Sequence, residues 1–333
     1  MALRSTVEAP LGLVSIDEVS MLRLLTGRLL AAVPLMFLVA TLVFFLAQAN
    51  SADPAGSILG LDASEETVAV KRAELGVDRS LFTQYVDWLG DAVRGDLGTN
   101  WFTGEEVTTE LKDRVPVTIA LAFGGLLIAV VVGCSFGVVA ALNAGRWPDR
   151  VITVVSSLGI AMPNFWIALV LSYYFAVQLG WFPAVWPPGG PDGLVGWVEA
   201  LVLPSVALGV AASAAIGRQT RSAMIGVLQR DYIRTALAKG LPVRRVVSRH
   251  AIRNASIPVV TLIGFQVSVL LGGSLFVELI YNIPGLGTYG VDAIFRGNVP
   301  ALLGFVMVIA LVVVVVNIAL DLSYAWLNPK VRG

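Results

Sequence analysis

Charged residues and cysteine are scarce in this chain of 333 residues. Only 14% of the residues are charged, against about 25% in an average soluble domain, and the mean hydropathy is +0.80. The single cysteine, Cys134, excludes a disulfide within the chain. None of the four lysines precedes Ser or Thr, so the chain lacks a P-loop and any use of ATP through one requires another protein. What remains is the composition of a protein embedded in lipid.

Six stretches contain no Asp, Glu, Lys or Arg, and each is long enough to cross a membrane, which takes about 20 helical residues. Prolines and glycines interrupt the second half of the third stretch, so we expect a single crossing there that ends near Gly180. The sequence therefore predicts an all-α membrane protein with six transmembrane helices. The stretches are 29–52, 115–145, 151–191, 200–217, 254–277 and 297–320.

Six crossings place both termini on one side of the membrane. With the termini inside, the cytoplasmic segments hold 16 Lys and Arg residues and the outer segments hold 7, which is the asymmetry that the positive-inside rule expects. Both termini are therefore predicted to be cytoplasmic. The expected divisions are a cytoplasmic segment 1–28, a first transmembrane helix 29–49, an extracytoplasmic segment 50–114, a core 115–325 of five transmembrane helices with a coupling loop 218–257, and a cytoplasmic tail 326–333.

The first apolar run could be mistaken for a secretory signal. It follows Arg23 and Arg28 and ends in Ala47-Gln48-Ala49, which resembles a cleavage site. However, the run is longer than the usual core of a signal peptide, about 7 to 15 residues, and its removal would spoil the charge asymmetry. We expect this segment to remain as the first transmembrane helix.

The predicted outer segment is acidic and contains two helix patterns. Between residues 53 and 114 it carries 13 acidic and 6 basic residues. Asp62 can cap one helix, with Glu65 completing a capping box and Gly76 at the stop. A second helix, Leu81 to Arg94, has one apolar face. Two interpretations stay open, an amphipathic cover over the outer surface or a contact surface for an external partner.

The segment from Arg218 to Ile257 is strongly basic, with nine Arg and Lys residues and one acid, Asp231. Topology alone explains many loops of this kind. This one also contains a short helix, 232–239, ended by Gly240 and Pro242. Arginines then recur every four residues in a second helix, which we expect to lie along the lipid headgroups. A short capped helix outside the membrane gives a separate protein something rigid to push on.

The segment Arg234-Thr235-Ala236-Leu237-Ala238-Lys239-Gly240 is similar to the EAAxxxG loop of the membrane subunits of ABC importers, although Arg replaces Glu and Thr replaces the first Ala. Together with the blocks given below, it makes the chain resemble the dipeptide/oligopeptide permease branch of that family and its B-type member. The resemblance runs nearly end to end, from about residue 20. Its further blocks are Leu75-Gly76-Val77-Asp78-Arg79, Arg94-Gly95-Asp96-Leu97-Gly98, Pro163-Asn164-Phe165-Trp166, Leu203-Pro204-Ser205, His250-Ala251-Ile252-Arg253-Asn254 and Pro284-Gly285-Leu286-Gly287.

The resemblance implies the type I ABC importer permease fold and an assembly in the plasma membrane of a prokaryote. The implied partners are a second, C-type permease subunit, two ATPase subunits or domains that hold ATP and Mg²⁺, and an extracytoplasmic substrate-binding protein. Peptides are the implied substrate; nickel, glutathione, opines and oligosaccharides are alternatives within the family. No catalytic, cofactor or metal site and no nucleic-acid partner is expected on this chain.

Two sets of contact residues follow from the resemblance. The loop helix is expected to receive the motion of the ATPases, and aromatic and acidic residues of the outer segment are candidates for touching the binding protein. The expected ATPase-coupling residues are Asp231, Tyr232, Arg234, Thr235, Ala236, Leu237, Lys239, Gly240 and Leu241. The candidate binding-protein contacts are Tyr85, Trp88, Asp96 and Trp101.

Polar residues within the spans provide a candidate translocation path; the alternative is hydrogen bonding between helices, which explains most Ser and Gln in spans. Ionisable residues, which usually mark ion coupling, are expected only at span ends, as Glu278 and Asp321, and this disfavours a secondary transporter. The dinucleotide-like Gly285–Gly290 lacks the required βαβ context. Gly133 and Gly137 indicate close helix packing. The candidate path residues are Asn164, Ser172, Gln266, Ser268 and Ser274.

Overall fold

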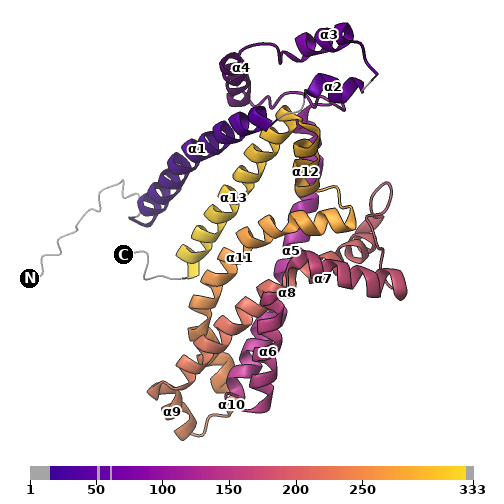
Figure 1. Cartoon of the computed structure of the whole chain (residues 1–333). Coiled ribbons are helices and arrows are strands. Elements are labelled where there is room, and N and C mark those ends of the chain that lie inside the picture. Colours follow the sequence, from indigo (N-terminus) through magenta and orange to yellow (C-terminus); the bar gives the residue numbers. More distant parts are fainter. Residues whose placement is uncertain (1–15, 51–52, 61, 328–333) are drawn as a thin grey trace, which may run out of the picture.

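The computed structural model describes residues 16–50, 53–60 and 62–327, and within these ranges the chain is built from helices (Figure 1). The predicted tail 326–333 lies largely outside the described residues. The helices are α1 (Ile16–Asn50), α2 (Pro54–Leu59), α3 (Glu65–Leu75), α4 (Leu81–Val93), α5 (Val107–Leu142), α6 (Trp147–Ala161), α7 (Asn164–Leu171), the π-helical η1 (Ser172–Gln178), α8 (Gly193–Leu228), α9 (Asp231–Ala238), α10 (Val243–Val246), the π-helical η2 (Val247–Ala251), α11 (Ile252–Tyr281), α12 (Leu286–Arg296) and α13 (Val299–Leu327).

Helices α5 and α8 form the central pair of the fold, and glycines allow their backbones to touch. A Cβ atom on Gly133 would lie 2.6 Å from the Ser213 carbonyl oxygen, and one on Gly137 would lie 2.6 Å from the Gly217 carbonyl oxygen. No real side chain tolerates such distances, so glycine is required at both positions. The predicted close packing at Gly133 and Gly137 is confirmed.

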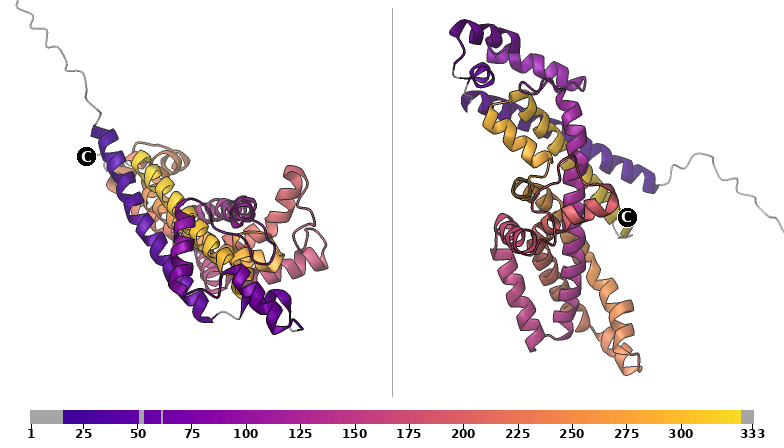
Figure 2. Two further views of the ribbon diagram at one scale, coloured as in Figure 1. Left: turned by 90° about the horizontal axis from the view of Figure 1, so that it is seen from above. Right: turned by 90° about the vertical axis from the view of Figure 1, so that its right-hand side faces the viewer.

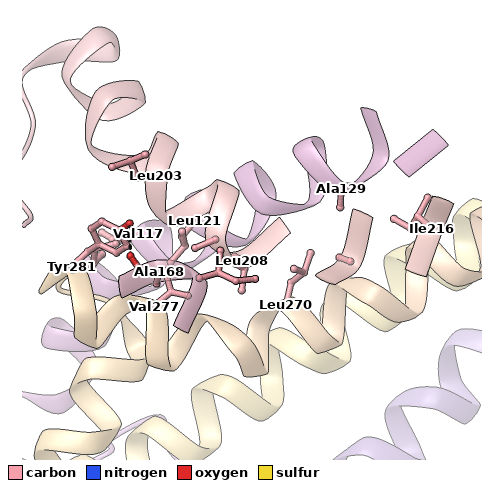
Figure 3. Packing of buried hydrophobic residues seen from close by; sticks show 14 of the residues in the cluster. Val117, Leu121, Ala129, Ala168, Leu203, Leu208, Ile216, Leu270, Val277 and Tyr281 are labelled. Carbon is pink, nitrogen blue, oxygen red and sulfur yellow. Dashed lines mark hydrogen bonds between the residues drawn. The ribbon is translucent and has the colours of Figure 1, made fainter. Parts of the chain in front are cut away.

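Helices α7 and α11 close over this pair and complete the main core (Figure 3). Leu121 of α5 and Leu208 of α8 are fully buried there, and Leu270 of α11 is buried against them. Tyr281, at the end of α11, donates a hydrogen bond from its hydroxyl to the Ala168 carbonyl oxygen of α7 at 3.1 Å. The core therefore ties the second half of the third predicted span directly to the fifth.

The third predicted span is not straight. Among the described residues, five helices are long and apolar enough to cross a membrane, and a sixth crossing is formed only if α6 and the α7–η1 segment count as one span bent by 102°. The bend lies at Met162 and Pro163, which have extended backbones (ψ 126° and 141°). Pro163 disfavours helical geometry in Met162, the residue before it. The predicted third crossing is therefore a bent pair of helices, and its second part ends at Gln178, near the expected Gly180.

The basic segment 218–257 is mostly helix rather than loop. Helix α8 continues to Leu228, and after α9 the chain is helical again from Val243 to Tyr281 without a break. The separate surface helix expected after Pro242 is thus the first part of the fifth span, and the charge-based span limits were too short. Only α9 and its flanking turns project beyond the long helices.

The molecule has two ends. Helices α2, α3, α4 and α12 gather at one end, called the outer end below, and α9 lies at the opposite, inner end (Figures 1 and 2). Helices α1 and α13 lie side by side in opposite directions, so the start of α1 and the end of α13 are at the same end of that pair. This arrangement agrees with the prediction that both termini lie on one side of the membrane.

Two helices of the outer segment match the sequence patterns, with one change of cap. The side chain of Ser64, not Asp62, accepts a hydrogen bond from the Thr67 amide at the start of α3. Gly76 ends this helix in the left-handed conformation, as expected. Helix α4 begins after Ser80, which caps it in the same way. The capping-box pattern correctly predicted α3, but the capping residue is Ser64, two residues after the predicted Asp62.

Candidate functional site

Helix α9 is a short, sharply terminated element at the inner end. The Gly240 amide donates to the Leu237 carbonyl oxygen, and the Leu241 amide donates to the Ala236 carbonyl oxygen. Gly240 has φ +79°, the left-handed conformation that glycine adopts without strain. The predicted helix and its stop at Gly240 and Pro242 are confirmed.

Helix α9 presents nearly all of its side chains to solvent. Ile233 is the exception, with 1% of its surface exposed, and it anchors the helix, which contacts α8 and α10. Ala236 and Leu241 are half-buried. Ile233 was absent from the predicted contact set, although its spacing within the helix could have identified it. The exposed members of that set are Asp231, Tyr232, Arg234, Thr235, Leu237, Lys239 and Gly240.

One arginine of the basic segment has a specific partner. Arg221, on α8, forms a two-point ion pair with Asp149 at the start of α6, and Asp149 also accepts from the Gly145 amide at 2.8 Å. Asp149 is buried and Arg221 is partly exposed. The pair fixes the turn between α5 and α6 against α8, close to the point where the chain leaves α8 for α9.

The candidate path residues lie on α7, η1 and α11 and differ in burial. Gln266 and Ser274 of α11 are buried, and the Ser274 hydroxyl donates to the Leu271 carbonyl oxygen of its own helix at 2.9 Å. Asn164, Ser172 and Ser268 are half-buried. Asn164 approaches α11, since a Cβ atom on Gly273 would lie 3.0 Å from the Asn164 amide nitrogen. The structure thus brings Asn164 to the helix that carries Gln266 and Ser274.

The exposed face of α11 is apolar. Phe265, Val269 and Phe276 are each about half or more exposed. Phe276 pairs with Phe165 of α7, and their ring centroids are 6.3 Å apart. This apolar face was not predicted from the sequence, although the spacing of Phe265, Val269 and Phe276 along the span could have indicated it.

Three of the four candidate binding-protein contacts face the membrane helices. Tyr85, Trp88 and Trp101 pack against buried residues of α1 and α13, and the Tyr85 hydroxyl is 2.7 Å from the Thr41 hydroxyl of α1. Asp96 alone is exposed, and it accepts from the Gly98 amide at 2.8 Å. This packing favours the amphipathic-cover interpretation of α4. The contact with an external protein remains a prediction.

A buried carboxylate, Glu110, organises the outer end of α5. It accepts hydrogen bonds from the Asn100 side-chain amide (2.8 Å), the Thr103 hydroxyl (2.9 Å) and the Tyr289 hydroxyl of α12 (2.7 Å). The Asn298 side chain donates to Asn100. Burial and the bond to Glu110 raise the pKa of the Tyr289 hydroxyl, so Tyr289 remains a neutral donor. This network was not anticipated, because its members are up to 198 residues apart in the sequence.

A second buried carboxylate, Glu278, holds the start of α12. It accepts from the Thr118 hydroxyl of α5 at 2.7 Å and from the Gly287 and Thr288 amides at 2.7 and 3.1 Å. A Cβ atom on Gly287 would lie 2.6 Å from the Leu275 Cα atom. The glycines of the dinucleotide-like pattern therefore allow α12 to wrap closely around Glu278. Glu278 lies near the end of α11, as expected, and the side chain of Asp321 is outside the described part of the structure.

These features define an integral membrane permease. Its spanning helices are apolar, its outer end is held together by the hydrogen bonds of two buried carboxylates, and a short helix is exposed at its inner end. The chain matches the family described as "Binding-protein-dependent transport system inner membrane component" over residues 133–333 and its N-terminal counterpart over residues 21–122. The protein belongs to this family and is an ABC importer permease subunit related to the dipeptide and oligopeptide type.

Two relatives illustrate the similarity. The glutathione transport system permease protein GsiC of Escherichia coli (strain K12) is 37% identical over 312 residues, which cover 94% of this chain and 99% of the relative. The probable peptide ABC transporter permease protein y4tP of Sinorhizobium fredii (strain NBRC 101917 / NGR234) is 37% identical over 305 residues, which cover 92% of this chain and 97% of the relative.

The fold is that of a type I importer permease. It resembles a chain of the MetNI methionine ABC transporter in an inward-facing conformation, with a TM-score of 0.55 and 16% sequence identity. The match covers 66% of this chain and 96% of the MetNI chain. At this identity the similarity establishes the fold alone.

Proposed function

We propose that this chain is one of two pore-forming subunits of an ATP-driven importer that moves peptides across the plasma membrane of a prokaryote. The observation that carries the proposal is the geometry of α9, a short helix that ends at Gly240, lies outside the long spans and has only Ile233 fully buried. A helix of this kind contributes little to the core of its own chain. It is well suited to be held by another protein.

The proposed partners supply what this chain lacks. Two ATPase subunits or domains bind ATP and Mg²⁺ and hold α9 in surface clefts through Arg234, Ala236 and Lys239. A C-type permease completes the pore, and the apolar face of α11 around Phe265 and Phe276 is available for it. An extracytoplasmic binding protein delivers the substrate at the outer end.

The connection from α9 to the spans is short and helical. Displacement of α9 acts on α8 at one side and on the continuous helix from Val243 to Tyr281 at the other. The Asp149–Arg221 pair extends this connection to α6. A push on α9 therefore moves three helices together and alters the wall formed by α7 and α11.

Peptide is the proposed substrate, and glutathione is the second candidate. GsiC, at 37% identity over nearly the whole chain, is named for glutathione transport, and y4tP is named as a probable peptide permease at the same identity. Glutathione is itself a modified tripeptide with free carboxylates, so both candidates present the same chemical groups.

The test is affinity purification from the native membrane, followed by reconstitution of the complex with its binding protein. We expect ATPase subunits to copurify and labelled peptide to accumulate in vesicles only when ATP and binding protein are present. Recovery of the chain without ATPases, or uptake driven by a proton gradient instead of ATP, would reject the proposal. Accumulation of glutathione but not of peptides would decide for the second candidate.

A further inference from the structure

A cleft with a volume of about 890 Å³ opens at the outer end, beside α12. The cleft is lined by the turn from Trp186 to Gly190 and by α12 with Thr288 and Tyr289. Arg114, two turns into α5, also lines it. Sites for small molecules typically measure about 300 to 1,000 Å³, so the cleft is large enough for a short peptide.

Arg114 is fixed in this cleft by an aromatic ring. Its guanidinium carbon lies 4.8 Å from the centroid of the Tyr289 ring, a cation–π arrangement. The ring in turn is held by the bond from the Tyr289 hydroxyl to buried Glu110. The guanidinium is thereby oriented before any ligand arrives, which reduces the entropy lost on binding.

Arg114 differs from its neighbour Arg296 in having no acidic partner. Arg296 lines the same cleft and is neutralised by Asp292 of its own helix at 2.7 Å. In the part of the chain that the structure describes, no carboxylate lies within ion-pair distance of Arg114. A partly buried, oriented guanidinium whose donors are available matches the planar geometry of a carboxylate.

The turn from Trp186 to Gly190 gives the cleft an apolar, well-held lining. The Trp186 amide donates to the Tyr281 carbonyl oxygen at 2.7 Å, and the Trp186 ring meets the Trp197 ring edge to face at 5.3 Å. Pro187 and Pro188 continue this lining. The cleft therefore offers both a cation and an apolar surface. Its ligand should be a small molecule with a free carboxylate and a compact body.

We propose that this cleft is a substrate-receiving site in which Arg114 binds the carboxylate of the peptide on its way from the binding protein to the spans. Tyr289 and Glu110 act as positioning residues for Arg114. The inference rests on the proposed function, since it assumes that the cargo is a peptide or a peptide-like molecule. It assigns to the permease a recognition step of its own, directed at the carboxylate rather than at side chains.

The test measures binding to the complete importer in nanodiscs without ATP, by equilibrium dialysis. The probes are labelled trialanine, labelled glutathione, and trialanine amide, which lacks the terminal carboxylate. We expect Arg114→Gln to weaken trialanine binding about tenfold or more, the effect of losing one charge-assisted hydrogen-bonding group. Trialanine amide should bind the unaltered importer as weakly as trialanine binds the variant.

Lys112→Gln is the matched control, because Lys112 is an exposed cation on the same helix outside the cleft. It should stay within about twofold of the unaltered importer, since exposed surface charges contribute little. Equal losses in both variants, or equal binding of trialanine and its amide, would overturn the proposal. So would the absence of measurable trialanine and glutathione binding.

The carboxylate that Arg114 binds could belong to the peptide or to an acidic residue of the binding protein, and one further outcome distinguishes the two. If Arg114→Gln retains trialanine but loses the stimulation of ATP hydrolysis by the binding protein, Arg114 contacts an acidic residue of that protein and the substrate site is refuted. ATP-driven uptake that persists without this binding refutes the site alone. Binding without ATP-driven uptake refutes the proposed function alone.

Discussion

At the outer end, α12 is tied to α5 and α11 by two buried carboxylates, Glu110 and Glu278, and each accepts hydrogen bonds from several elements. At the inner end, α9 is anchored by the side chain of Ile233 and otherwise faces solvent. The outer end is held together by its own hydrogen bonds, whereas the inner end exposes a short helix that the proposed function assigns to contact with an ATPase. Substitutions should therefore change stability at the outer end and coupling at the inner end.

The largest loss of stability is expected from Glu278→Ala. The substitution leaves the Thr118 hydroxyl and the Gly287 and Thr288 amides without their acceptor in a buried site. Unsatisfied buried groups cost about 1 to 3 kcal/mol each, so the free energy of unfolding should fall by about 3 kcal/mol or more. Thermal unfolding of the purified complex measures this. Asp292→Ala, at an exposed acid of α12, is the control, and equal melting temperatures for the two variants would contradict the account.

A smaller loss is expected from Glu110→Ala. Asn100, Thr103 and Tyr289 lose their acceptor, but the site is nearer the surface and water can replace part of the network. We expect about 2 kcal/mol, together with weaker trialanine binding because Tyr289 no longer fixes Arg114. Glu106→Ala, at an exposed residue one turn earlier, should change neither quantity. Unchanged trialanine binding by Glu110→Ala would show that the Glu110 network does not position Arg114.

At the inner end, Ile233→Ala should free α9 without unfolding the spans. Truncation of a buried isoleucine to alanine costs about 2 to 5 kcal/mol. Here the loss should weaken the packing of α9 against its neighbours and leave the spans folded. Hydrogen exchange in α9 should accelerate while exchange in α5 stays constant, and uptake per ATP hydrolysed should fall. Val243→Ala, at an exposed neighbour, is the control. A general loss of protection would show that α9 belongs to the global folding unit.

Gly240→Val should act on coupling with still less effect on stability. Valine in a left-handed conformation costs at least about 1 to 2 kcal/mol, so the turn after α9 should rearrange and misplace the helix. We expect normal insertion and assembly, continued ATP hydrolysis and reduced uptake in proteoliposomes. Gly226→Ala, in open space within α8, provides the comparison. Uptake that equals the Gly226→Ala value would remove the turn from the mechanism.

The smallest effect is expected from Arg72→Gln. Arg72 bonds to Asp53 at 2.7 Å and lowers the pKa of that carboxyl below its ordinary value of 3.8. Because the folded-state pKa is lowered, the pair contributes above the ordinary value and its contribution is lost as the pH falls through the lowered one. At neutral pH we expect faster hydrogen exchange in α2 only. A change in uptake would contradict the account.

Sequence reasoning succeeded where the determinants are local. The stop of α9 at Gly240, the close packing at Gly133 and Gly137, and the existence of α3 and α4 all follow from residues within a few positions of one another. Such patterns act through the backbone of a single turn or helix face, so they can be recognised without knowing the fold.

Features that depend on contacts between residues far apart in the sequence could not be predicted. The Tyr289–Glu110 bond joins positions 179 residues apart, and no local pattern marks either residue as buried. Runs of uncharged residues gave predicted spans that were too short. Helix α8 continues past Arg218 to Leu228, and the continuous helix that contains α11 begins at Val243. The bend at Pro163 was missed because the stretch was judged by length and charge, whereas a proline changes the local direction of the chain.

The most direct test of the account is uptake by proteoliposomes that contain the complete importer, its binding protein and internal ATP, with either the unaltered chain or Ala236→Trp. Ala236 is half-buried on α9, so a bulky side chain there should displace α9 within the ATPase cleft without preventing assembly. We predict ATP-dependent accumulation of peptide by the unaltered importer, and hydrolysis without accumulation by an assembled Ala236→Trp complex. Equal accumulation by both would contradict the assignment of α9 as the element that couples ATP hydrolysis to transport.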